Sequence, residues 1–155
     1  MDKNPEIIKN AISGSLKTIE QDREKEIISR RFGLSGSKET LEQIGEMLSI
    51  TRERVRQLEK AILIHLKISA EEGKIPEIAA AEKLLIRNLI EVGRVAKVAD
   101  LAAKIYGRPA TAAERAEIVF IGTFSANLTV ITENDFYYPA VAIADYGDEP
   151  TIIVA

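Results

Sequence analysis

A run of polar side chains between residues 52 and 60 could read the edges of DNA bases. On a helix with 100° per residue, five of them fall within one arc of about 140°: Arg52, Glu53, Arg56, Gln57 and Lys60. Arginine can donate two parallel hydrogen bonds to guanine, glutamine can pair with adenine, and glutamate can accept from cytosine. The same arc also fits the solvated face of an ordinary amphipathic helix, so the neighbouring residues must decide between the two.

Two helices joined by a tight corner are predicted around this arc. Thr40 and Gln43 form a T-x-x-Q capping box, which marks a helix start. Gly45 has no side chain to hold a neighbouring helix away, and the apolar pattern breaks at 49–50 before Thr51 offers a second cap. The spacing therefore predicts a helix-turn-helix whose second helix presents the polar arc.

The segment from about Arg23 to Lys67 resembles region 4 of the bacterial sigma-70 family, the domain that recognises the upstream promoter hexamer. The phrases REKEIISRRFGL and TLEQIGEMLSITRERVRQLE carry this resemblance. It implies that Arg52, Glu53, Arg56 and Gln57 approach base edges. Lys60 and Thr51 complete the candidate contacts of the second helix.

Phosphate contacts are also implied by the resemblance. Arg23, Thr40 and the backbone of Leu41 are placed near phosphates, which helix N-termini and basic side chains bind readily. Arg54 points away from the arc, so either a phosphate contact or an ion pair within the domain is expected for it.

The chain also departs from the family pattern. Ala61, Ile64 and His65 stand where many members place basic residues late in the recognition helix, which weakens the expected phosphate grip. Nothing in the chain resembles the regions that hold the core polymerase clamp or melt the downstream promoter element. By itself this chain is therefore not expected to act as a complete sigma factor.

Composition excludes several other classes of protein. The 155 residues contain no cysteine and a single histidine, His65, which argues against disulfide scaffolds and metal centres. Neither a phosphate-binding loop nor a nucleophile–base pair is evident, so no catalytic residues, cofactor or small-molecule substrate are predicted. No apolar run approaches the roughly 20 residues of a membrane span, and a cytoplasmic location is expected.

Charge is distributed unevenly along the chain. Residues 23–67 hold ten basic and seven acidic residues, a net charge of +3, whereas residues 68–155 hold eight basic and thirteen acidic residues, a net charge of −5. A basic segment is what phosphate binding requires. The acidic remainder is expected to disfavour non-specific DNA binding.

Three parts are predicted: a helical domain over 1–68, a linker over 69–76 and a second domain over 77–155. The first four helices are expected to pack together, with helices over 4–19 and 22–32 preceding the helix-turn-helix. The recognition helix becomes apolar on nearly all sides at its end, where Ile62, Leu63, Ile64 and Leu66 follow one another within five residues. Such a surface is usually covered, so either the second domain or a second copy of the chain, as a homodimer, is expected to pack there.

The second domain shows the element order of a winged helix. Helices are predicted at 81–92, 98–106 and 111–126, a short extended piece at 94–97, and strands at 128–132 and 136–143, with a hairpin turn at 133–135 and an edge strand at 151–154. Weakly, it resembles the winged-helix module of the RNA polymerase delta subunit. The fold class is therefore mainly α, a helix-turn-helix domain followed by a winged-helix α+β domain with a small antiparallel hairpin.

The usual reading helix of a winged helix is poor in basic residues here. Over 111–126 it carries only Arg115 against Glu114 and Glu117. This module is therefore expected to bind protein or to stabilise the first domain. The cluster Tyr137-Tyr138-Pro139 is either a contact patch or a wing strand packed on its own core.

Two functions follow from these observations. The first is a transcription regulator that binds double-stranded promoter DNA, with its second domain contacting RNA polymerase or another factor. The alternative is an adaptor that docks on the β-subunit flap of the polymerase core and makes little direct contact with DNA. The first function is preferred, although the acidic second domain and the absence of basic residues late in the recognition helix support the alternative.

Overall fold

A computed structural model describes residues 4–131 and 139–144 of the chain. Its elements are, in order, α1 (Asn4–Lys17), α2 (Asp22–Phe32), α3 (Leu41–Leu48), α4 (Arg52–Glu71), α5 (Pro76–Val92), β1 (Val95–Lys97), α6 (Val98–Tyr106), α7 (Ala112–Phe124), β2 (Leu128–Ile131) and β3 (Ala140–Ile143). This order confirms the predicted fold class, mainly α with one small antiparallel sheet. In the described parts of the chain, no helix is long and apolar enough to cross a membrane.

The helix-turn-helix consists of α3 and α4, with α2 packed against both of them. The capping box at the start of α3 is present, because the Thr40 hydroxyl accepts from the Gln43 backbone and the Gln43 side chain accepts from the Thr40 backbone. Ser49 ends α3 with a left-handed backbone, φ 58°. The Thr51 hydroxyl then accepts from the Arg54 backbone at 3.1 Å and caps α4. Both predicted caps are therefore present, and the corner itself lies between Ser49 and the Thr51 cap.

The second half has the connectivity of a winged helix, α5-β1-α6-α7-β2-β3. Its strands are antiparallel in the order β1-β3-β2, so that β3 lies between its two neighbours. Val141 pairs with Ala96 on one side and with Val130 on the other. Several predicted features lie outside the described residues: the hairpin turn at 133–135, Tyr137, Tyr138 and the edge strand at 151–154.

The connection between the two halves is shorter than the predicted linker over 69–76. Helix α4 continues through Glu71, and α5 already begins at Pro76, so only residues 72–75 lie between helices. Proline fits the first position of a helix because its missing N–H is not needed there. The division of the chain into domains over 1–68 and 77–155 stays a prediction.

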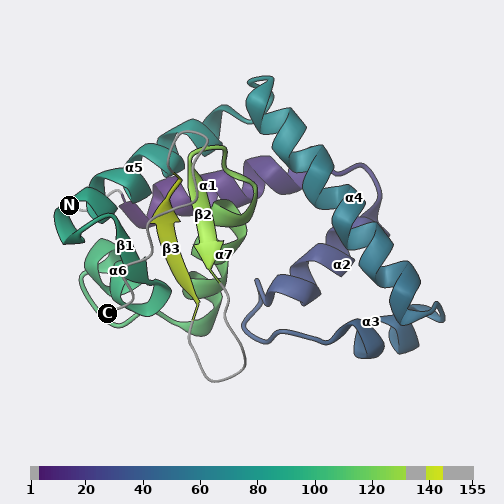
Figure 1. Cartoon of the computed structure of the whole chain (residues 1–155). Helices are drawn as coiled ribbons and strands as arrows, with labels where there is room; N and C mark the ends of the chain where they lie inside the picture. Colours follow the sequence, from purple (N-terminus) through teal and green to yellow (C-terminus); the bar gives the residue numbers. More distant parts are fainter. Residues whose placement is uncertain (1–3, 132–138, 145–155) are drawn as a thin grey trace.

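Helix α1 packs chiefly on the second half of the chain. Its main neighbours are α5, α7 and α6, and in Figure 1 it runs behind the sheet while α2, α3 and α4 lie to one side. Ile8 and Ala11 are fully buried there. The first four helices were expected to pack as one unit, and the structure differs in the position of α1. The apolar stripe of α1 indicates that the helix is covered, but it does not indicate which helix covers it.

Helix α7 holds the two halves together. Phe120, which is fully buried, contacts Phe32 of α2 and Phe124 in edge-to-face arrangements, each with ring centroids 5.1 Å apart. Helix α7 also packs against α1, α4, α5 and α6. One hydrophobic core therefore runs through the helix-turn-helix and the winged helix. Helix α4 packs against α7 and α5, and its Ile62 and Leu66 are buried, whereas Ile64 stays exposed.

Candidate nucleic-acid interface

The predicted polar arc lies on the exposed face of α4. Burial along the helix follows Val55, Leu58, Ile62 and Leu66, and this stripe packs into the core. The four predicted base-reading side chains and the neighbouring Lys60 are solvent-exposed on the other side: Arg52, Glu53, Arg56, Gln57 and Lys60. They occupy the first nine residues of the helix, the end that enters a groove in helix-turn-helix docking. The structure thus brings these residue types together on one accessible surface.

Two of the arginines are held by carboxylates on this surface. Arg52 contacts Glu42 of α3 at 2.9 Å, and the Arg56 Nε lies 3.0 Å from both carboxylate oxygens of Glu53. The Arg56 guanidinium holds the pKa of Glu53 below its usual range, and Glu53 raises the pKa of Arg56. All four side chains are exposed, and exposed ion pairs contribute little to stability. The ion pairs orient Arg52 and Arg56, and a ligand that binds the guanidinium groups more strongly can replace the carboxylates.

The remaining side chains of the arc are free to bind. Within the described residues, neither Gln57 nor Lys60 makes a side-chain hydrogen bond or an ion pair. Arg54 is also exposed, and it has no carboxylate partner in the part of the chain that the structure describes. Among the described residues, Arg54 thus makes no ion pair, and its phosphate contact stays a prediction.

The phosphate-binding candidates lie at two helix starts. Thr40 caps α3, and Leu41 is the first residue of that helix, where a backbone N–H has no partner within the helix. Arg23 is exposed in the first turn of α2. Helix starts favour anions, since free N–H groups and the helix dipole both point toward them.

Glu42 and Arg31 are two residues of this surface that the sequence did not single out. Glu42 positions Arg52 across the corner, and Arg31 of α2 reaches Glu59 of α4 at 3.0 Å. These partners lie 10 and 28 residues apart in sequence. Helical spacing does not reveal either pair, because both cross from one helix to another.

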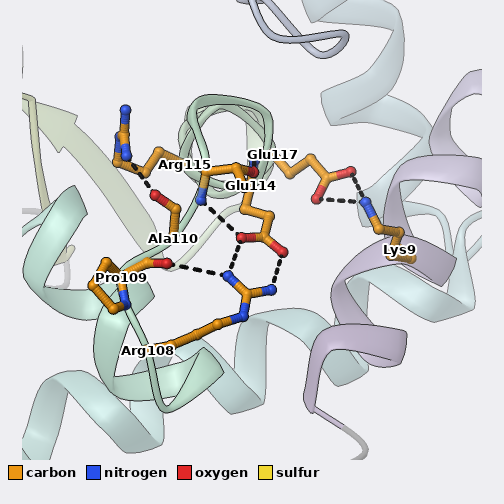
Figure 2. A network of polar contacts seen from close by, with 8 residues as sticks. Lys9, Arg108, Pro109, Ala110, Glu114, Arg115 and Glu117 are labelled. Atoms are coloured by element: carbon orange, nitrogen blue, oxygen red, sulfur yellow. Dashed lines mark hydrogen bonds and ion pairs between the residues drawn. The ribbon is translucent and has the colours of Figure 1, made fainter.

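The winged helix does not present its usual reading helix. Of the residues in α7, nine are buried, including the carboxylate-bearing Glu114 and Glu117. Figure 2 shows Glu117 directed at Lys9 of α1 and Glu114 held in a forked contact with Arg108. Arg115, the single basic residue of α7, donates to the Ala110 carbonyl at 2.6 Å. Helix α7 is thus enclosed by its own chain.

The two acidic residues of α7 respond oppositely to their surroundings. The Arg108 guanidinium lowers the pKa of Glu114 to about 2, with help from the Thr111 backbone. Burial raises the pKa of Glu117, although Lys9 at 3.1 Å opposes this. Burial also raises the pKa of Tyr106, whose hydroxyl has no hydrogen-bond partner within the described residues. Helix α7 is therefore tied to α1 through Lys9 and to the loop after α6 through Arg108.

We expect the Glu114→Gln variant to lose part of the pH dependence of folding. Because the folded-state pKa of Glu114 is depressed, its stabilisation is fully present above the unfolded pKa of about 4.5 and is lost as the pH falls through about 2. Glutamine can keep the capping box with Thr111 but cannot carry the charge. Thermal unfolding between pH 7 and pH 2 should show a less stable variant at pH 7 with a shallower acid decline.

The control for this measurement is Glu71→Gln, at an exposed acid outside the network. It should reproduce the acid decline of the wild-type chain. If Glu114→Gln also reproduces that decline, the ion pair with Arg108 does not stabilise α7.

Comparisons with known proteins show which family the helix-turn-helix resembles. Residues 21–67 match the family model described as "Sigma-70, region 4". This segment contains α2, α3 and α4 up to Lys67, and the match makes it similar to sigma-70 region 4, a DNA-binding helix-turn-helix of the promoter-recognition type.

Curated relatives match the same part of the chain. RNA polymerase sigma factor sigB of Arabidopsis thaliana is 39% identical over 61 residues, which are 39% of this chain and 11% of that protein. RNA polymerase sigma factor SigA4 of Synechococcus elongatus is 39% identical over 57 residues, 36% of this chain and 18% of that protein. The chain spans less than a fifth of the length of either relative. No solved structure matches, and no comparison shows the likeness of the second half to the delta subunit, which is based on element order and on phrases such as LIEVGRVAKVADLAAKIYG.

Proposed function

We propose that this protein is a sequence-specific DNA-binding transcription regulator that recognises promoter DNA of the upstream-hexamer type. The observation that carries this proposal is the exposed arc of Arg52, Glu53, Arg56, Gln57 and Lys60 at the start of α4. It lies within the segment that matches sigma-70 region 4. A charged helical face alone would not suffice, but here the face, the corner and the family match coincide.

Binding would exchange protein ion pairs for DNA contacts. Arg52 would leave Glu42 and Arg56 would leave Glu53, and each guanidinium could then donate twice to a guanine edge. The released Glu53 carboxylate could accept from cytosine, and Gln57 could pair with adenine. Because both exchanged ion pairs are exposed, breaking them costs little.

The phosphate contacts would position the helix. The free N–H groups at the start of α3, together with Thr40 and Arg23, would bind one strand, while Arg54, Thr51 and Lys60 would contribute from α4. Such contacts fix the register of the protein but carry no direct sequence information. The net charge of +3 over residues 23–67 supports this arrangement.

RNA polymerase is the proposed protein partner, since the matched relatives are polymerase sigma factors. The β-subunit flap of the core enzyme is the proposed docking element for the helix-turn-helix. The acidic second half would then act as a scaffold, because its usual reading helix is enclosed by the chain itself.

Alanine substitution in the arc tests this function. We expect Arg56→Ala and Gln57→Ala each to weaken binding to a selected promoter duplex roughly ten- to hundredfold and to relax the choice of base at one position. Fluorescence anisotropy of labelled duplex, at one fixed salt concentration, measures both effects. The matched control is Arg87→Ala on α5, an exposed arginine remote in sequence from the matched segment, which should leave affinity nearly unchanged.

The same titration separates DNA recognition from a polymerase adaptor. If both variants bind duplex as the wild-type chain does, α4 does not read bases. If the wild-type chain captures the isolated β flap but binds no duplex, the protein is a polymerase-binding adaptor and not a DNA-binding regulator.

A further inference from the structure

A groove runs between the middle of α4 and the end of α7. Its volume is about 500 Å³. Ten residues of α2, α3, α4 and α7 line it: Arg31, Leu41, Arg56, Glu59, Lys60, Leu63, Ile64, Lys67, Thr123 and Phe124. Thr123 and Phe124 lie outside the segment that matches sigma-70 region 4. The groove is therefore formed by this chain's own combination of two modules.

The groove pairs an apolar floor with a basic rim. Leu41, Leu63 and Ile64 contribute apolar surface beside Phe124. The Ile64 residue is 51% exposed, although α7 packs against α4. The rim carries four basic side chains, from Arg31, Arg56, Lys60 and Lys67. Its single carboxylate, Glu59, is already engaged by Arg31 at 3.0 Å. Because Arg56 is paired with Glu53 outside the groove, the free positive charge among the described lining residues comes from Lys60 and Lys67.

Phosphate is a poor match for this floor. A nucleic-acid backbone needs hydrogen-bond donors along its path, whereas three leucine and isoleucine side chains and a phenylalanine offer none. Apolar side chains rimmed by charge are instead typical of a groove that receives one face of an amphipathic helix. Charge complementarity then requires acidic residues on the flanks of that helix.

We propose that this groove binds an acidic amphipathic helix of a partner protein. Its apolar face covers Ile64 and Leu63, and its carboxylates face Lys60 and Lys67. Arg56 and Lys60 belong both to this groove and to the proposed base-reading arc. The partner helix and a DNA duplex therefore compete for α4, so that binding of the partner releases DNA. Only this competition rests on the proposed DNA-binding function.

Synthetic peptides provide the probe. A fluorescein-labelled 14-residue helix of leucine and glutamate, with the leucines on one face, is titrated with the full chain and followed by anisotropy. One comparison peptide has lysine in place of every glutamate, and another has the same composition with its leucines spread around the helix. The acidic amphipathic peptide should bind at least about tenfold more tightly than either. Equal binding of the three peptides overturns the proposal.

Variants locate the peptide on the protein. Thr123→Glu should weaken binding and Thr123→Lys should strengthen it, each by about threefold or more, because Thr123 is exposed on the α7 wall. Ile64→Gln should weaken binding about tenfold by removing apolar contact. The matched control is Ile68→Gln, since Ile68 is 49% exposed on the same helix but does not line the groove. Binding that responds to Ile68→Gln and not to Ile64→Gln places the peptide elsewhere and overturns the proposal.

Two further measurements separate this site from its alternatives. Arg52→Ala and Gln57→Ala should weaken duplex binding and leave peptide binding unchanged, because neither residue lines the groove. DNA binding can thus be lost while peptide binding is kept, and peptide binding can be lost while DNA binding is kept. Failure of one proposal can therefore be distinguished from failure of the other. Sedimentation equilibrium tests for self-association: a wild-type dimer that Ile64→Gln dissociates would mean that a second copy of this chain occupies the groove, and the partner helix would be excluded.

Discussion

Replacing Phe120 with alanine is expected to destabilise the whole chain by about 3–5 kcal/mol. The Phe120 side chain is fully buried on α7 and contacts Phe32 of α2 and Phe124 edge-to-face. Alanine would remove apolar contact and leave a cavity between the helix-turn-helix and the winged helix. Urea unfolding followed by circular dichroism measures the loss of free energy of unfolding.

Ile90→Ala is the control for this experiment, because Ile90 is 58% exposed on α5. Its effect should stay within about 0.5 kcal/mol. The wild-type chain should unfold in a single transition, since one core runs through both halves. A Phe120→Ala variant that is nearly as stable as the control, or a wild-type chain with two separate transitions, would contradict the shared core.

The second large effect is expected at the corner of the helix-turn-helix. A Cβ atom added at Gly45 would lie 2.7 Å from the Ile50 carbonyl oxygen, closer than such atoms approach in proteins. Alanine normally stabilises a helix relative to glycine, but here the turn would have to open. We expect Gly45→Ala to lower stability by roughly 1–3 kcal/mol and to reduce duplex affinity, because α4 would be reoriented relative to α3.

Gly14→Ala is the matched control, a second glycine within a helix. Its added Cβ would meet the carboxylate end of Glu77 at 2.8 Å, and that flexible side chain can move away. Stability should therefore stay the same or rise. If Gly45→Ala behaves like Gly14→Ala, the close approach at Ile50 does not constrain the corner.

Local features of the fold could be predicted well from the sequence. The capping boxes at Thr40 and Thr111 and the glycine ends of α2 and α6 are present as expected. These signals involve residues within one or two turns of each other, so their hydrogen bonds depend little on the rest of the fold. The exposed face of α4 was predictable for the same reason, since helical spacing alone separates it from Val55 and Leu58.

Long-range packing could not be predicted in the same way. The apolar stripe of α1 indicates burial but does not name α5 as its partner. Lys9 and Glu117 meet across 108 positions of sequence, and Arg52 meets Glu42 across the corner. The groove between α4 and α7 also requires both halves of the chain. In each case the contact depends on how helices are placed, and no periodic pattern records that placement.

Selection of bound sequences from random duplexes tests the central claim most directly. Wild-type protein and Gln57→Ala are each taken through the same selection, and the enriched sequences are compared. If α4 reads bases, the wild-type chain enriches one defined motif, and Gln57→Ala enriches that motif with the choice of base relaxed at one position. An absence of any enriched motif, or identical motifs from both proteins, would contradict base reading by Gln57 on the exposed face of α4.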